Sequence, residues 1–549
     1  MSAPVWDPVA ETRRMDALER AEAAEVANPG VLVRFWDKFM REEGEEHSYL
    51  SLEFSDKVNT AGGLRMVCPR DMTHFDHLFN NEDGEDATIP ITVNVGEHYR
   101  WDGYVTKASI VRDENGVETV DIEAIHCWNH VATICCWASP FAPILAQFPR
   151  HHILFGPTRT IACEYLMTNL IRRQAANWGP AGGWANAPDG MGAGNVLFPI
   201  AVVPVDGWRD TTKWSAGSAR FHQADQLLVP MLTAADVQLE ARFFIPGEDE
   251  QPAPDYYWLS LPTVVLELKD KSGVTGPTGT LIDGLISFVE DFLDDGTTPV
   301  RYPNLNSTTE YEAVYGQPGP LGTVRNFPWV WYREGEYSGI GPAEVALHKP
   351  TATDVIVGGK SPGWVNAGIE IAIKNALAWL GLLIGVPGLD SLYQGQLDDV
   401  FLAWMVYSNA ERIRRAGPYA FREMRVTGSD KAFTLAGVVA GVDGLHKTRG
   451  YTSKKVSIDP YGAPYRFGKD YELGDQIGFE LGDKLFTDFV TEVTFVDTRD
   501  VAARLELVIG DGSDEEDTLV KAWGRMGSIT GALTDLFSDV GADLDLIIF

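Results

Sequence analysis

The sequence contains few cysteines and few basic residues, and both shortages exclude classes of protein. Five cysteines occur among 549 residues, an odd number, and none has the CxxC spacing of zinc ribbons or redox motifs. We therefore expect reduced thiols rather than a disulfide framework. Lysine and arginine total 45 against 78 aspartates and glutamates, a formal net charge of −33. Because binding to nucleic-acid backbone depends on neutralising phosphates with cations, this balance argues against a DNA- or RNA-binding protein.

Common signatures of catalytic and nucleotide sites are also missing. HExxH does not occur, and the glycine-rich stretch 179–194 has no Gly-Lys-Ser/Thr at its end. The stretch GKSPG at 359–363 matches the GxSxG nucleophile elbow. Pro362, however, lacks the backbone N–H that the oxyanion hole of that fold requires. The sequence therefore favours a polar turn at this position.

Histidines and cysteines crowd the run HCWNHVATICC at 126–136, but this run is apolar and contains no glycine. A buried segment is therefore favoured over a metal site. His74 and His77 are interpreted in the same way, as parts of a packed helical turn. A cysteine hydrolase that pairs Cys163 with His222 is permitted only by the number of such residues. We predict no catalytic residue, no metal and no cofactor.

One apolar run raises the question of a membrane. Crossing a bilayer as a helix takes roughly 20 apolar residues, and the uncharged run 375–389 is shorter and contains three glycines and a proline. It also lacks the basic face of an interfacial helix. We predict that it packs within protein, and contact with a host membrane at infection is the less favoured alternative. The candidate apolar tip consists of Trp379, Leu380, Leu382, Leu383 and Ile384.

What the sequence does contain is a pattern rich in strands. Hydrophobic residues make up 45% of the chain, enough for large buried cores. Residues 31–37 alternate, and Asn115-Gly116 within the segment 89–124 is a strong hairpin signal. Further strands are expected within 197–206, 237–246, 258–270 and 452–509. Helices are expected from Pro157 to Arg173, and over 281–295, 366–384, 397–417 and 432–445.

Three segments of the chain carry a family resemblance. They are WNHVATICCWASPFAPILAQFPRHHILFGPTRTIACEYLMTNLIRR at 128–173, AERIRRAGPYAFREM at 410–424 and PYRFGKDYELGDQIGFELGDKLFTDFVTEVTFV at 464–496. The most specific element is the phrase Tyr471, Leu473, Gly474 and Asp475, in which glycine and aspartate supply a turn between strands. Together the segments resemble minor tail proteins of long non-contractile-tailed phages that infect actinobacteria. The resemblance covers about residues 30–515.

The resemblance implies the central hub of a tail tip, similar in fold to the hub trimer of contractile baseplates. Such a hub has two similar β-barrels per chain, and three chains place six barrels around the tail channel. The implied partners are two further copies, the distal tail protein, the tape measure protein and other minor tail or fibre proteins. Genomic DNA would only pass through. The implied location is the virion tail tip, after synthesis in the host cytoplasm.

The predicted fold class is α+β and β-rich, with two β-barrel-like domains flanking mixed middle domains that include a helical hairpin. The expected parts are an N-terminal helical arm (1–30), a first β-barrel hub domain (31–150), mixed α/β middle domains (151–365), a helical hairpin and connecting helix (366–450), a second β-barrel hub domain (451–511), and an acidic loop with a C-terminal helix (512–549). Two alternatives stay open. One is a tail-associated peptidoglycan hydrolase, and the other is a host-surface glycan-binding tail protein.

Overall fold

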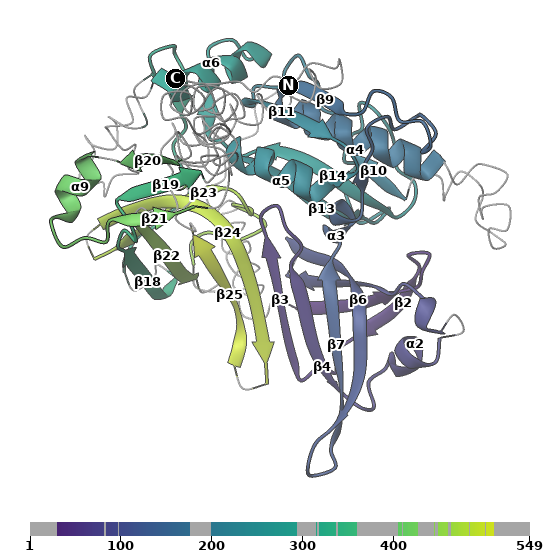
Figure 1. Cartoon of the computed structure of the whole chain (residues 1–549). Helices are drawn as coiled ribbons and strands as arrows, with labels where there is room; N and C mark the ends of the chain where they lie inside the picture. Colours follow the sequence, from purple (N-terminus) through teal and green to yellow (C-terminus); the bar gives the residue numbers. More distant parts are fainter. Residues whose placement is uncertain are drawn as a thin grey trace, which may run out of the picture.

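The structure is a computed structural model, and it describes most residues between 30 and 509. The described ranges are 30–81, 84–96, 98–175, 199–293, 315, 318–335, 339–358, 404–408, 410–426, 444, 448, 450–458, 463–482, 484–499 and 501–509. Within them, strands dominate and many belong to one 13-stranded sheet (Figure 1). The predicted β-rich α+β fold class is confirmed.

The large sheet joins strands from both parts of the chain. The N-terminal strand set consists of β1 (Val31–Trp36), β2 (Glu42–Glu46), β3 (Ser51–Lys57), β4 (Gly63–Pro69), β5 (Pro90–Val95), β6 (Tyr99–Arg112) and β7 (Glu118–His126). The C-terminal strand set consists of β17 (Trp331–Tyr332), β18 (Ile340–His348), β22 (Tyr451–Ile458), β23 (Gln476–Leu481), β24 (Lys484–Thr498) and β25 (Val501–Ile509).

The two strand sets meet where β3 pairs with β24 in antiparallel register, side by side in Figure 1. Phe54 lies opposite Phe495, and their rings stack with centroids 5.0 Å apart. Both side chains belong to the same hydrophobic core. The strands predicted for 31–150 and 451–511 therefore share one sheet and one core, and their division into two barrel domains stays a prediction.

The hairpin of β6 and β7 shows how the sequence determines the faces of this sheet. Gly116, with φ +83°, lies in the connecting turn, as the Asn-Gly signal predicts. Along β7, Val120 and Ile122 are fully buried, whereas Asp121 and Glu123 on the opposite face are only half-buried. This is the period-2 alternation of a strand with one face on a core.

The middle unit packs helices against short strands. Its elements are α3 (Asn129–Ala132), β8 (Cys135–Cys136), β9 (His152–Pro157), α4 (Thr158–Ala175), β10 (Ile200–Val202), β11 (Trp214–Ala219), β12 (His222–Gln223), α5 (Ala224–Ala234), β13 (Val237–Phe244), β14 (Thr263–Asp270), β15 (Val274–Thr275), α6 (Leu281–Leu293) and β16 (Val324–Arg325). Helix α4 begins after Pro157, and its apolar face, which includes Tyr165 and Leu166, is buried as predicted. The predicted strands within 197–206, 237–246 and 258–270 are confirmed.

The helix predicted over 397–417 is wrong at Trp404–Ser408. These residues form strand β20, which pairs with β19 (Asp354–Gly358), while β21 (Glu423–Arg425) pairs with the other edge of β19. Trp404 and Val406 are 45% and 60% exposed, whereas Met405 and Tyr407 are half-buried. That alternation has period two and not the helical 3.6. The helical part is α9 (Ala410–Ala416).

Other predicted segments lie outside the described residues. They are the arm 1–29, the loop 179–194, GKSPG at 359–363, the segment 366–384 with the candidate tip residues Trp379, Leu380, Leu382, Leu383 and Ile384, most of 432–445, and 512–549. Among the described residues, no helix combines the length and apolar character needed to cross a membrane. The helical turn predicted at His74 and His77 is confirmed, because helix α2 (Phe75–Phe79) begins directly after His74 and contains His77. A 3-10 turn, η1 (Gly84–Asp86), follows farther along the chain.

Candidate functional site

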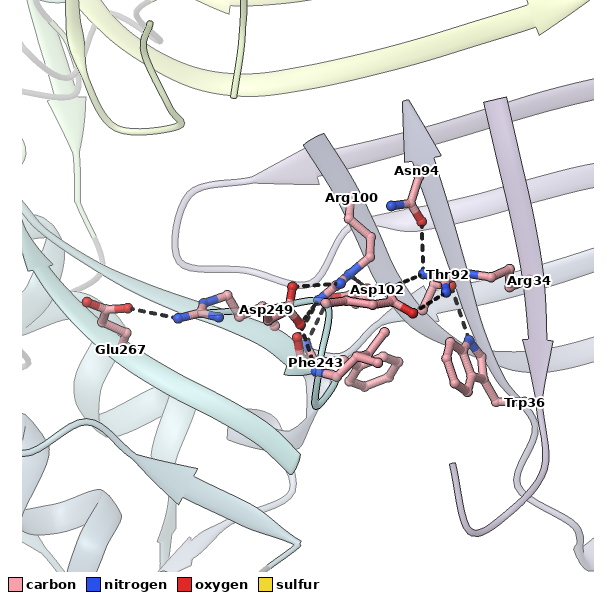
Figure 2. Close-up of polar contacts among 12 residues, drawn as sticks. Arg34, Trp36, Thr92, Asn94, Arg100, Asp102, Phe243, Asp249 and Glu267 are labelled. Carbon is pink, nitrogen blue, oxygen red and sulfur yellow. Dashed lines mark hydrogen bonds and ion pairs between the residues drawn. The ribbon is translucent and has the colours of Figure 1, made fainter. Parts of the chain in front are cut away.

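A polar junction connects the N-terminal strand set to the ribbon formed by β13 and β14 (Figure 2). Arg100 on β6 contacts Asp249, in the turn after β13, through two hydrogen bonds: Nη1 donates to Oδ1 at 3.0 Å and Nη2 to Oδ2 at 2.9 Å. The same guanidinium donates through Nε to Asp102 Oδ1 at 2.8 Å. Bidentate pairing of a planar guanidinium with a carboxylate fixes orientation as well as distance. The strand β6 and the turn are therefore held in one relative orientation.

Asp102 is the buried centre of this junction. Its Oδ2 accepts a hydrogen bond from the backbone N–H of Phe243 at 2.7 Å, so one carboxylate contacts both sides of the junction. Burial raises the pKa of Asp102 above its ordinary value, although Arg100 and the Phe243 N–H act in the opposite direction. A buried carboxylate depends on such partners, because leaving it unpaired is costly.

A second arginine makes the same kind of bidentate contact with Glu248, the residue before Asp249. Arg34 on β1 donates to both oxygens of Glu248, through Nη1 at 2.7 Å and Nη2 at 2.9 Å. Its guanidinium also lies 5.0 Å from the ring centroid of Trp36, whose Nε1 donates to Thr92 Oγ1 at 3.1 Å. Glu248 and Asp249, which are consecutive in the β13–β14 turn, are thus paired with arginines from two different strands.

The opposite end of the ribbon contacts the segment 471–475, which carries the most specific part of the family resemblance. Lys271 Nζ lies 2.6 Å from Asp475 Oδ1, and Lys269 Nζ lies 2.7 Å from Glu472 Oε2. Burial would raise the pKa of Glu472, but its ion pairs with Lys269 and Lys271 lower that pKa below the ordinary value. The ribbon is therefore connected by ion pairs to the N-terminal strand set at one end and to the C-terminal strand set at the other.

The phrase itself forms a tight turn over a buried tyrosine pair. Tyr471 and Leu473 are buried, and the hydroxyl of Tyr471 lies 3.0 Å from that of Tyr332. Gly474 has φ +78°, and a Cβ at this position would lie 2.8 Å from Gln238 Oε1. Glycine is the residue that adopts this conformation without steric cost. Gly474 and Asp475 lie against the ribbon, whereas Tyr471 and Leu473 are buried in the core of the large sheet. The role of these four residues as a hub motif stays a prediction.

The arginine residues of the junction were not predicted from the sequence. Arg34 lies between the buried residues Val33 and Phe35, and Arg100 and Asp102 lie on either side of the buried Trp101. The acidic pair Glu248 and Asp249 follows the apolar end of β13. Charged residues inside otherwise apolar strands are the available signal, because buried charges require partners. That signal indicates that a partner exists, but it does not indicate which residue.

The histidines and cysteines that the sequence offered as metal ligands or as a nucleophile differ in burial. Within the run 126–136, Cys127 and Cys136 are fully buried, as predicted for an apolar segment. Cys163 is buried with its sulfur 3.7 Å from the carbonyl oxygen of Val203, and burial raises the pKa of this thiol. A nucleophilic cysteine requires a lowered pKa. His222 is exposed on β12. In the described part of the chain, no three His, Cys, Asp or Glu residues are grouped to hold a metal ion.

The comparisons with known proteins place this chain in the virion tail of bacteriophages. The chain belongs to the family described as Siphovirus ReqiPepy6 Gp37-like protein, which matches residues 32–511. Minor tail protein Gp28 of Mycobacterium phage D29 is 25% identical over 476 residues, covering 75% of this chain and 79% of that protein. The protein of the same name from Mycobacterium phage L5 is 24% identical with the same coverage. The predicted resemblance to minor tail proteins of actinobacterial phages is confirmed.

Two solved structures that match the chain are also tail proteins. A tail protein from Neisseria meningitidis MC58 has a TM-score of 0.38 and 10% identity, covering 89% of this chain and 99% of that one. The 43 kDa tail protein of prophage MuSo2 from Shewanella oneidensis has a TM-score of 0.37 and 8% identity, covering 88% and 99%.

Proposed function

We propose that this tail protein is the homotrimeric central hub of the tail tip, which connects the tail tube to tip and fibre proteins and guides DNA exit. The observation that carries the proposal is the connection of the β13–β14 ribbon to both strand sets, which themselves share one sheet. A hub must keep its upper and lower contacts in a fixed relative orientation. Bidentate arginine pairs and a continuous sheet resist relative rotation of the parts they join.

The proposed partners follow from this position. The distal tail protein and the tape measure protein lie on the side of the tube, and other minor tail or fibre proteins lie at the tip. DNA contacts the hub only in passage, and an excess of 33 negative charges per chain disfavours binding to phosphate. We expect a channel face that is acidic or neutral. The role requires no catalytic residue, metal or cofactor.

The assembly state tests this proposal most directly. Native mass spectrometry of the full chain, together with cross-linking of purified virions, should give a species of three chains of 60.4 kDa each. A label on the chain should appear at the tail tip in electron micrographs. A stable dimer both in solution and in the particle would contradict the proposal, because a two-fold contact does not close a three-fold ring.

Two further assays separate the alternatives. Zymography on peptidoglycan with the purified protein should show no cleared band, and a cleared band would favour the tail-associated hydrolase. A glycan array should show no binding to host cell-wall saccharides. Saturable binding there would favour the glycan-binding tail protein instead.

A further inference from the structure

The loop 139–150, here called the apolar loop, displays hydrophobic side chains to solvent. It connects β8 to β9, and its most exposed members are Leu145 at 96% and Phe148 at 83%. Phe141 and Ile144 are exposed as well. Single exposed apolar residues are ordinary, but a run of them within one short loop marks an interaction site or an aggregation liability.

Hydrogen bonds within the loop hold it in the conformation that exposes these side chains. Gln147 Oε1 accepts from the backbone N–H of Ser139 at 2.9 Å, and Gln147 Nε2 donates to the carbonyls of Ala142 and Pro143 at 3.2 and 3.1 Å. Ser139 Oγ donates to the carbonyl of Phe148 at 2.7 Å. A loop ordered before it binds loses less conformational entropy in the complex. The apolar loop is therefore organised for contact.

The surrounding sequence differs in charge from the rest of the protein. The chain has 78 acidic residues, yet none occurs from residue 124 to residue 163. The apolar loop ends at the exposed cation Arg150. A surface that is apolar and weakly basic is complementary to an acidic one, and charge complementarity selects partners and orients their approach.

A complementary surface exists on the same chain, in the loop 246–260 between β13 and β14, here called the acidic aromatic loop. It exposes Tyr256 at 60% and Trp258 at 73%, and the acidic residues Glu250 and Asp255 of the same loop are exposed as well. Gln251 holds this loop too, because its side chain accepts from the N–H of Leu259 at 2.8 Å and donates to the carbonyl of Leu259 at 2.7 Å. Tyrosine and tryptophan are the residues most enriched among energetically dominant interface positions.

We infer that the apolar loop of one chain docks on the acidic aromatic loop of a second copy of the chain. The two loops are different surfaces, so the contact is heterologous, and repeating it around an axis closes a ring. The inference rests on the proposed homotrimer and identifies the contact that forms it. Phe148 and Leu145 pack against Tyr256 and Trp258, and Arg150 faces the carboxylate of Asp255.

A mixing experiment tests the contact. One double variant, Leu145→Asp with Phe148→Asp, removes the apolar loop as a docking surface and keeps the acidic aromatic loop. The other double variant, Tyr256→Ala with Trp258→Ala, removes the acidic aromatic loop as a docking surface and keeps the apolar loop. Each variant alone should be a folded monomer, with the concentration for half assembly raised by roughly 30-fold or more. Mixed together, they should form a dimer that holds one intact contact and cannot close. Val117→Asp, at an exposed site in the β6–β7 turn, is the matched control and should assemble as the wild type does.

The outcomes separate this inference from the proposed function. If the wild type is a trimer and the loop variants still trimerise, or if their mixture gives no dimer, the docking contact is wrong and the hub proposal is unaffected. Virions that carry Leu145→Cys with Trp258→Cys should give a ladder up to three chains on non-reducing gels. Disulfide linkage to a different tail protein, or no ladder in virions in which lysine cross-linking shows a trimer, would overturn the contact. Virions without any trimer of this chain would overturn the hub.

Discussion

Arg100 and Asp249 are 149 positions apart in the chain, and their side chains form a bidentate pair with both N···O distances at or below 3.0 Å. Arg100 has only 13% of its side chain exposed, and Asp249 has 19%. The pair therefore lies in a site where water compensates little for the loss of a partner. It connects the first part of the large sheet to the middle unit.

Replacing Asp249 with asparagine should lower the free energy of unfolding by roughly 3 kcal/mol, because the arginine charge then stays buried with fewer partners. Urea denaturation measures this loss. Glu123→Gln is the control, since Glu123 pairs with Lys107 and the two side chains are 45% and 59% exposed. Exposed pairs contribute about 0–1 kcal/mol. Equal losses for the two variants would show that the junction contributes no more than a surface ion pair.

Replacing Gly474 with alanine should destabilise the protein for two reasons. The positive φ costs a residue with a Cβ roughly 1–2 kcal/mol, and the new Cβ would lie 3.2 Å from Lys271 Cγ and closer still to Gln238. Gly482→Ala is the control, because Gly482 has φ +60° and nothing within 4 Å of an added Cβ. Thermal unfolding should therefore give a lower Tm for Gly474→Ala than for Gly482→Ala. Equal Tm values would mean that the crowding at Gly474 has no cost.

His130 should make the protein less stable in acid. Burial lowers the pKa of His130 from 6.5 to about 4, with Arg173 contributing in the same direction. The unfolded chain binds this proton at higher pH than the folded one. The stabilisation is therefore fully present above pH 6.5 and is lost as the pH falls toward 4, at up to about 1.4 kcal/mol per pH unit.

The variant His130→Gln isolates this effect. The difference in unfolding free energy between wild type and variant should shrink as the pH falls from 6.5 to 4. Burial raises the pKa of Asp56 and Asp102, so these residues act in the opposite direction, but they are common to both proteins. A difference that does not change over this range would show that His130 is not held neutral by burial.

The cysteines should differ in their reaction with iodoacetamide in the native protein. Burial raises the pKa of Cys68 and Cys136 to about 12, and it also raises the pKa of Cys127 and Cys163. Cys135 is half-exposed. Peptide mass spectrometry should find alkylation first at Cys135, because only a thiolate that the reagent reaches can react. Rapid alkylation of Cys163 would revive the hypothesis of a cysteine hydrolase.

Local patterns in the sequence predicted local structure well. The Asn115-Gly116 turn, the alternation along β7 and the buried face of α4 all follow from short-range rules that the structure obeys. The error at Trp404–Ser408 arose because a short run of apolar residues fits a helix or a strand equally well. There, the partner strand β19 decides the conformation.

Long-range pairing was beyond such patterns. Alternation in β3 indicates which face is buried, but it does not indicate that the neighbour is β24. Similarly, the sequence identified the phrase at Tyr471 to Asp475, but Lys269 and Lys271 came from a distant ribbon whose position only the fold determines. The candidate site was therefore predictable as separate segments and not as a junction.

The pairing of β3 with β24 also has a consequence for how the chain folds during synthesis. The hydroxyl of Tyr49 donates to Asp497 at 2.6 Å across 448 positions of sequence, beside the pairing of the two strands. At ribosomal rates of roughly 5–20 residues per second, the edge of β3 waits on the order of tens of seconds for its partner. An unpaired strand edge is a template for aggregation. We therefore expect that chains truncated before β24 aggregate in the host cell, and that chaperones associate with the nascent chain until β24 has emerged from the ribosome.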